Sequence, residues 1–118
     1  MLSLNGSYRY YLKREYTDLR KSFDSLSGIV SSELGRNPLS GDIFVFFNRR
    51  RNQVKMLHWE GDGFSIYYKR LERGTYELPE LSKTANHVEL TNDSLLLILR
   101  GISLRSIKRR IRYVHVQN

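Results

Sequence analysis

The sequence predicts a single α+β domain in which an antiparallel meander of three or more strands packs on one main helix. With 118 residues, the chain is long enough for one hydrophobic core and too short for two ordinary domains. A helical stripe of apolar residues precedes three short segments rich in β-branched and aromatic residues. The loops between these segments have about four to six residues, and such short connections favour antiparallel hairpins over parallel crossovers.

A short strand and the main helix come first. Residues 7–12 (SYRYYL) have the aromatic content of a strand. The helix is expected over residues 17–34, with Thr17 as its cap, Asp18 at the positive end of its dipole and Gly35 just after its end. Its expected buried face is the stripe formed at steps of three and four by Leu19, Phe23, Leu26, Val30 and Leu34.

Three strands are then expected over residues 43–47, 54–59 and 64–69. Apolar side chains alternate onto both faces of these strands, so neither face of the sheet is cleanly polar. The main helix covers one face. The other face requires a second layer, which is either a C-terminal helix or a partner.

The rest of the chain reads as shorter elements and a basic segment. Gly74 and Pro79 mark a turn and an exit over residues 70–81, and residues 87–90 form a short strand. A capped helix is expected over residues 93–100, closed by Gly101. One domain therefore spans residues 1–118, with its core in 7–101 and a basic segment, helical or extended, in 102–118.

The net charge of +8 is concentrated near the C-terminus. Residues 100–118 hold six of the 20 lysines and arginines and none of the 12 acidic residues. This asymmetry indicates a polyanionic partner, most simply DNA. The longest apolar run, residues 95–99, is too short to span a membrane, and residues 1–6 do not resemble a secretory signal. A cytoplasmic location is therefore expected.

The sequence predicts neither a catalytic centre nor a bound metal or cofactor. The chain has no cysteine, and His58, His87 and His115 lack the spacing of metal ligands. One enzymatic hypothesis is a small nuclease that uses Asp42, Glu60 and Asp62 at strand ends. The glycines on either side of Asp62 are explained equally well by a hairpin turn.

Three groups of cations are the candidate DNA-binding residues. Arg49, Arg50 and Arg51 occupy a hairpin tip, which either grips phosphates or simply keeps the turn soluble. The strand order predicts that this tip shares one end of the sheet with the second group, Lys69, Arg70 and Arg73. The third group, in the C-terminal segment, comprises Arg105, Lys108, Arg109, Arg110 and Arg112.

Three blocks of the sequence resemble a known family. They are residues 17–30 (TDLRKSFDSLSGIV), residues 34–79 with the motif LSGDIFVF…RRR…KMLHWEGDGFSIYYKRLERG, and residues 95–104 (LLLILRGISL). In content and order they resemble the TnpB-type proteins, the second-open-reading-frame products of the IS sixty-six family of bacterial insertion sequences. The resemblance implies a non-enzymatic accessory protein of transposition, encoded beside a separate DDE-type transposase. It also makes Arg20 and Lys21 candidate partner-binding residues.

Two main hypotheses follow. In the first, the protein binds DNA through its basic patches and assists the transposase. In the second, it is a protein–protein adaptor within the transposase complex and does not contact DNA itself.

Overall fold

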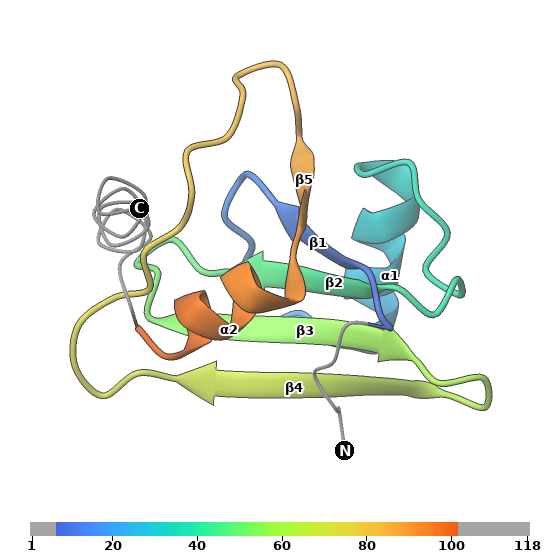
Figure 1. Ribbon diagram of the computed structural model, residues 1–118. Helices are drawn as coiled ribbons and strands as arrows, with labels where there is room; N and C mark the ends of the chain where they lie inside the picture. Colours follow the sequence, from blue (N-terminus) through green and yellow to red (C-terminus); the bar gives the residue numbers. More distant parts are fainter. Residues whose placement is uncertain (1–6, 102–118) are drawn as a thin grey trace.

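The structure of the protein is a computed structural model that describes residues 7–101, in which a five-stranded sheet carries one helix on each face (Figure 1). The prediction of an α+β fold built on an antiparallel meander and a main helix is confirmed. In chain order the elements are β1 (Tyr10–Lys13), α1 (Phe23–Ser32), β2 (Ile43–Phe47), β3 (Gln53–Trp59), β4 (Phe64–Arg70), β5 (His87–Leu90) and α2 (Asn92–Leu99).

The strands lie in the order β4-β3-β2-β1-β5. Short hairpins join β2, β3 and β4 into the predicted meander, with Val45 opposite Met56 and Met56 opposite Tyr67. β1 pairs with β2 in parallel, with Tyr10 beside Ile43, because the chain between them crosses over through α1. β5 closes the other side of β1 in antiparallel register, with Tyr10 opposite Leu90.

Alternating side chains give the sheet two hydrophobic cores. On one face, Phe44, Phe46 and Leu57 pack with Leu26 and Val30 of α1. On the other face, the buried strand residues pack with α2 and with Tyr76 from the loop after β4; they include Ile43, Val45, Phe47, Val54 and Met56. The second layer that the sequence requires is thus supplied by α2 and this loop.

The main helix begins at Phe23, so the expectation that it begins at Thr17 is wrong. The backbone N–H of Thr17 donates to the carbonyl of Phe47 at 2.8 Å and is held beside β2. Asp18 then organises a turn, since its carboxylate accepts from the backbone N–H and the guanidinium of Arg20. These local bonds compete with a first helical turn. Ser22 takes the cap position without a side-chain bond.

The helix ends close to where Gly35 predicts. α1 stops at Ser32, and Gly35 adopts a left-handed φ of 63°. Leu19 and Leu34 lie outside the helix but are buried in the same core as Leu26 and Val30, so the apolar stripe identifies core residues beyond the helix itself. Phe23, the remaining member of the stripe, is 42% exposed.

α2 begins with a capped turn, in which Thr91 Oγ1 accepts from the N–H of Ser94 at 3.1 Å. The helix runs back along the sheet towards the end where β2 and β4 terminate, and Gly101 follows it with a φ of 75° (Figure 1). The C-terminal candidates Arg105 to Arg112 lie outside the described residues. Among residues 7–101, no helix is long and apolar enough to cross a membrane.

Candidate nucleic-acid interface

One end of the sheet gathers most of the cations of the described chain. β1, β2 and β4 end there, while β3 and β5 begin there, so loops that are distant in sequence become neighbours (left side of Figure 1). The register sets Gln53 opposite Arg70, which places the arginine tip beside the end of β4, as the strand order predicts. We call this region the basic end; its cations are Lys13, Arg14, Arg49, Arg50, Arg51, Lys69, Arg70 and Arg73.

The arginine tip between β2 and β3 has a fixed backbone. The side-chain oxygen of Asn48 accepts from the N–H groups of Asn52 and Gln53 at 3.0 and 2.9 Å, and its amide donates to Asn52 Oδ1 at 2.7 Å. Arg51 has a φ of 56°, a left-handed conformation that this turn imposes on a non-glycine residue. Its carbonyl accepts from the N–H of the buried Tyr76 at 2.7 Å. The tip is therefore tied to the core.

A hollow of about 410 Å³ adjoins the tip on its α1 side. We call it the arginine hollow; its polar wall comprises Tyr16, Asp18, Arg20, Arg49, Arg50 and Gln53. The structure therefore brings the candidate partner residue Arg20 beside the candidate DNA residues Arg49 and Arg50. Lys21 does not line the hollow, but its carbonyl accepts from Lys55 Nζ at 2.9 Å and so joins the turn to β3.

Asp18 is neutralised within this hollow by Arg20. The guanidinium Nη2 lies 2.7 Å from the carboxylate. Hydrogen bonds from the side chain and backbone of Arg20 lower the pKa of Asp18 to about 2. Both side chains are largely exposed, so the pair adds little to stability and chiefly fixes the shape of the turn.

Two exposed tyrosines flank the same region. Tyr16 is 58% exposed, and the guanidinium of Arg49 lies 5.9 Å from its ring centroid. Tyr68 is 51% exposed, with Lys55 Nζ 5.3 Å from its ring centroid, and its hydroxyl donates to Gln53 Oε1 at 3.1 Å. Neither ring is among the site residues predicted from the sequence. Tyr68 directly precedes Lys69 and Arg70, and this position could have marked it as a candidate.

The basic end also carries two cations, Lys13 and Arg14, that are not among the site residues predicted from the sequence. Parallel pairing brings Lys13 and Arg14 from the end of β1 to the arginine tip. Two further hollows, of about 300 and 130 Å³, lie between Arg14, Arg51 and Leu78. The missed signal was the helix between the first two strands, because a helical crossover predicts parallel strands that end on the same side.

Lys69, Arg70 and Arg73 are exposed, whereas Lys13 is buried and its ammonium donates to the carbonyls of Glu15 and Tyr16. Arg70 lies 3.5 Å from Glu72, an exposed contact that costs little to open. Among residues 7–101, carboxylate partners of these cations are otherwise limited to Glu15, which lies 3.6 Å from Arg14. The charge of the basic end is therefore mostly available for a ligand.

The opposite end of the sheet is acidic. Asp42 precedes β2, Glu60 and Asp62 lie in the turn between β3 and β4, and Asp93 lies in the first turn of α2. We call this region the acidic end. Gly61 has a φ of 95°, so turn geometry accounts for the glycine beside Asp62. Within residues 7–101, no cluster of three or more His, Asp or Glu side chains is arranged to hold a metal ion.

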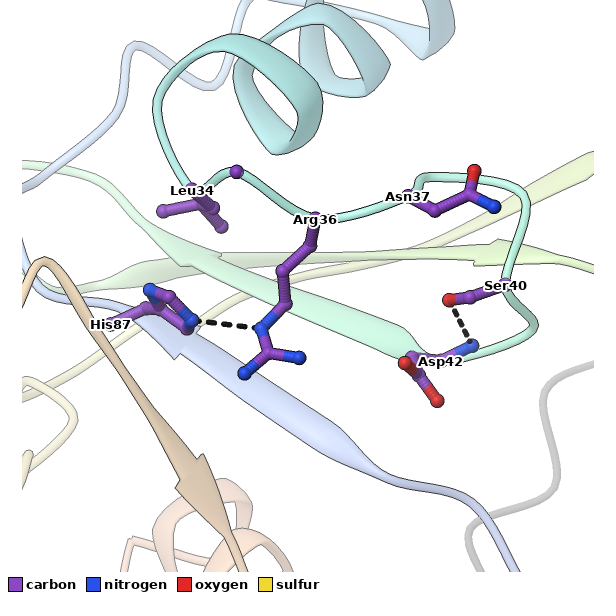
Figure 2. A pocket seen from close by; sticks show the side chains of 7 residues that line it. Leu34, Arg36, Asn37, Ser40, Asp42 and His87 are labelled. Carbon is purple, nitrogen blue, oxygen red and sulfur yellow. Dashed lines mark hydrogen bonds between the residues drawn. The ribbon is translucent and has the colours of Figure 1, made fainter.

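A separate pocket of about 450 Å³ lies between the end of α1 and β5 (Figure 2). Arg36 crosses it, stacked 3.8 Å from the ring centroid of Tyr11, and its Nε donates to His87 Nε2 at 2.8 Å. Burial, aided by the charge of Arg36, lowers the pKa of His87, which keeps the ring neutral and able to accept this bond. Asp42 lines the far side of the pocket (Figure 2).

Comparisons with known proteins identify the family. Residues 8–109 match the sequence profile of the family described as IS66 Orf2 like protein. Two proteins of Sinorhizobium fredii (strain NBRC 101917 / NGR234) are similar along nearly their whole length. The uncharacterized protein y4hO is 32% identical over 89% of this chain and 90% of its own, and the uncharacterized protein y4jC is 27% identical over 93% and 92%. No solved structure matches the chain significantly. The chain therefore belongs to the IS66 Orf2-like family, as its sequence motifs suggest.

Proposed function

We propose that this protein is an accessory factor of DNA transposition that binds DNA through its basic end and thereby assists a separate DDE-type transposase. Membership of the IS66 Orf2-like family supports the role in transposition. The observation that carries the DNA-binding part is the convergence of Arg14, Arg49 to Arg51, Lys69 and Arg70 on one end of the sheet.

The chemistry of these side chains suits phosphate. Guanidinium groups bind phosphate oxygens through two parallel N–H bonds, and this geometry makes arginine the usual choice for such contacts. The fixed backbone of the arginine tip supports the proposal further, since a preorganised loop loses little entropy on binding. We propose that the basic residues of the C-terminal segment, from Arg105 to Arg112, add further phosphate contacts.

A salt titration tests the proposal. Fluorescence anisotropy with a labelled duplex should show an affinity that falls linearly with salt on logarithmic axes. If about four phosphates are neutralised, the affinity should drop roughly a hundredfold between about 50 and 200 mM salt. Binding that stays in the millimolar range at low salt would refute the proposal.

The adaptor hypothesis has one observation in its favour. β4 is an edge strand whose first five residues, Phe64 to Tyr68, carry no charge, although edge strands commonly carry charges that block pairing. A strand from another protein of the element could add to this edge. Co-purification with the cognate transposase in the absence of DNA, lost on Ile66→Pro but kept when Arg49 and Arg50 are changed to alanine, would favour the adaptor over the DNA-binding factor.

A further inference from the structure

We infer that the basic end takes single-stranded DNA, whose unpaired bases stack along a track that runs from Tyr16 across the arginine hollow to Tyr68. This inference rests on the proposed DNA binding and specifies the form of DNA that the site prefers. A double helix hides the faces of its bases, whereas a single strand offers each base for stacking on an aromatic side chain.

The first observation is the exposure of the two rings. Tyr16 and Tyr68 are 58% and 51% exposed, whereas Tyr10 and Tyr11 of β1 and Tyr76 are buried. Exposed tyrosines among arginines are typical of surfaces that bind a flexible polyanion, because the ring supplies contact area and the cation supplies charge. Both rings belong to the basic end, whereas the acidic end has no comparably exposed tyrosine within residues 7–101.

The second observation is that Tyr68 is held in place before any ligand arrives. Its hydroxyl donates to Gln53 at 3.1 Å, and Lys55 lies 5.3 Å from the ring centroid. Lys55 is itself fixed, since its ammonium donates to the carbonyl of Lys21 at 2.9 Å. A base that stacks on this ring therefore meets a surface that needs little ordering.

The third observation is continuity between the rings. Tyr16 and Gln53 line the same hollow, and Gln53 bonds to Tyr68, so a strand can pass from one ring to the other without leaving the basic surface. The volume of about 410 Å³ lies within the range of about 300 to 1,000 Å³ that is usual for small-ligand sites. It therefore has room for a base or a sugar-phosphate unit.

The charges along the track suit the backbone of the strand. Arg49 and Arg50 line the hollow with Tyr16, and Lys55 lies beside Tyr68, so guanidinium and ammonium groups are available to phosphates near both rings. Asp18 would oppose a phosphate in the hollow, but its carboxylate is already bound to Arg20 at 2.7 Å. The negative charge of Asp18 is thus neutralised by Arg20, which lines the same hollow.

The test compares one labelled strand of about twelve nucleotides with its own duplex, by anisotropy at about 50 mM salt. Tyr68→Leu and Tyr16→Leu should each weaken single-strand binding between about fivefold and a hundredfold, the loss expected for one stacked base. Duplex binding should stay within about twofold of wild type, because phosphates alone hold the duplex. Tyr68→Phe keeps the ring and should retain single-strand affinity.

The matched control is Leu39→Ala in the loop before β2. Leu39 is 51% exposed, as is Tyr68. This substitution should alter neither affinity. Trp59, the single tryptophan, lies at the end of β3 away from the basic end, and its fluorescence checks that each variant is folded.

The outcomes separate the two proposals. If both leucine variants bind the single strand within about twofold of wild type, or weaken duplex binding by the same factor, the stacking track is refuted while DNA binding stands. If the wild-type protein binds neither form of DNA, the proposed function fails as well.

Discussion

The two ends of the sheet are built from the same strands but differ in charge and in how their loops are held. At the acidic end, the turn between β3 and β4 relies on Gly61 at a φ of 95° and carries Glu60 and Asp62. At the basic end, Arg51 takes a left-handed conformation without being glycine, and Asn48 and Tyr76 bind the surrounding backbone. Side-chain hydrogen bonds and a strained backbone thus hold the arginine tip, whereas a glycine suffices for the turn between β3 and β4.

This difference supports the proposal that a ligand binds at the basic end. A turn whose function is only to reverse the chain is satisfied by glycine, as at Gly61. A positively charged loop that is fixed by side-chain bonds and by a buried tyrosine retains its arginines in one arrangement, despite the backbone cost of about 1 kcal/mol for a non-glycine residue in the left-handed region. Substitutions at the two ends can separate the effect of anchoring the loop from the effect of its charge.

The largest effect is expected at the anchor of the basic end. Tyr76 is 1% exposed and packs at 5.3 Å between ring centroids against Phe47, so Tyr76→Ala should lower the free energy of unfolding by about 3 to 5 kcal/mol. Urea denaturation followed by Trp59 fluorescence measures this change.

Tyr76→Phe is the control for this experiment. Burial raises the pKa of Tyr76 to about 12, and its hydroxyl has no hydrogen-bond partner among the described residues. Removing that hydroxyl should therefore change stability by less than about 1 kcal/mol. A large loss in Tyr76→Phe would mean that the hydroxyl, and not ring packing, anchors this loop.

The next effect concerns charge. Reversing Arg49 and Arg50 to glutamate should weaken duplex binding by about a hundredfold, because each charge-assisted bond contributes about 1.5 to 3 kcal/mol. The matched variant reverses Glu60 and Asp62 to arginine at the acidic end, and its affinity should stay within about threefold of wild type. If the second variant gained as much affinity as the first one lost, net charge and not the basic end would govern binding.

The smallest effect is a pH dependence at the pocket of Figure 2, which contains His87. The titratable groups that face this histidine are Arg36, Asp42 and Tyr11, together with Lys13, which lies opposite His87 on β1. The pKa of His87 is lowered in the folded protein, so the unfolded chain binds more protons near pH 6. The stability from neutral His87 should be fully present above about pH 6.5 and decline as the pH falls below it.

The thermal midpoint at about pH 7.5 and about pH 5.5 checks this prediction. His87→Gln should show a smaller drop between the two pH values than wild type, since glutamine can accept from Arg36 and does not titrate. An equal drop in both proteins would assign the pH dependence to other groups.

The meander could be predicted because its information is local. Short loops, alternation and the glycines of the turns define β2, β3 and β4 within a single stretch of sequence, and the same stretch sets the arginine tip beside Lys69 and Arg70. Tyr11 and Lys13 illustrate what could not be predicted in this way. Their strand, β1, pairs with β2 and β5, and nothing within residues 7–13 specifies either partner.

The predicted start of α1 was wrong for a related reason. Thr17 and Asp18 have the residue types of a helix start, but the N–H of Thr17 bonds to Phe47, which lies far along the chain. A tertiary bond thus overrode a local preference. The composition of the arginine hollow follows from this bond, since it holds the turn that carries Arg20 against the arginine tip.

The position of β1 also determines the order in which the chain can fold. β1 is synthesised first, yet Tyr10 finds one neighbour at Ile43 and the other at Leu90. The hairpins of β2, β3 and β4 close short loops and should form early, whereas β1 waits for contacts of long sequence separation. We expect a nascent chain that stops before β5 to leave one edge of β1 without a partner strand, so a late part of the domain protects the first strand.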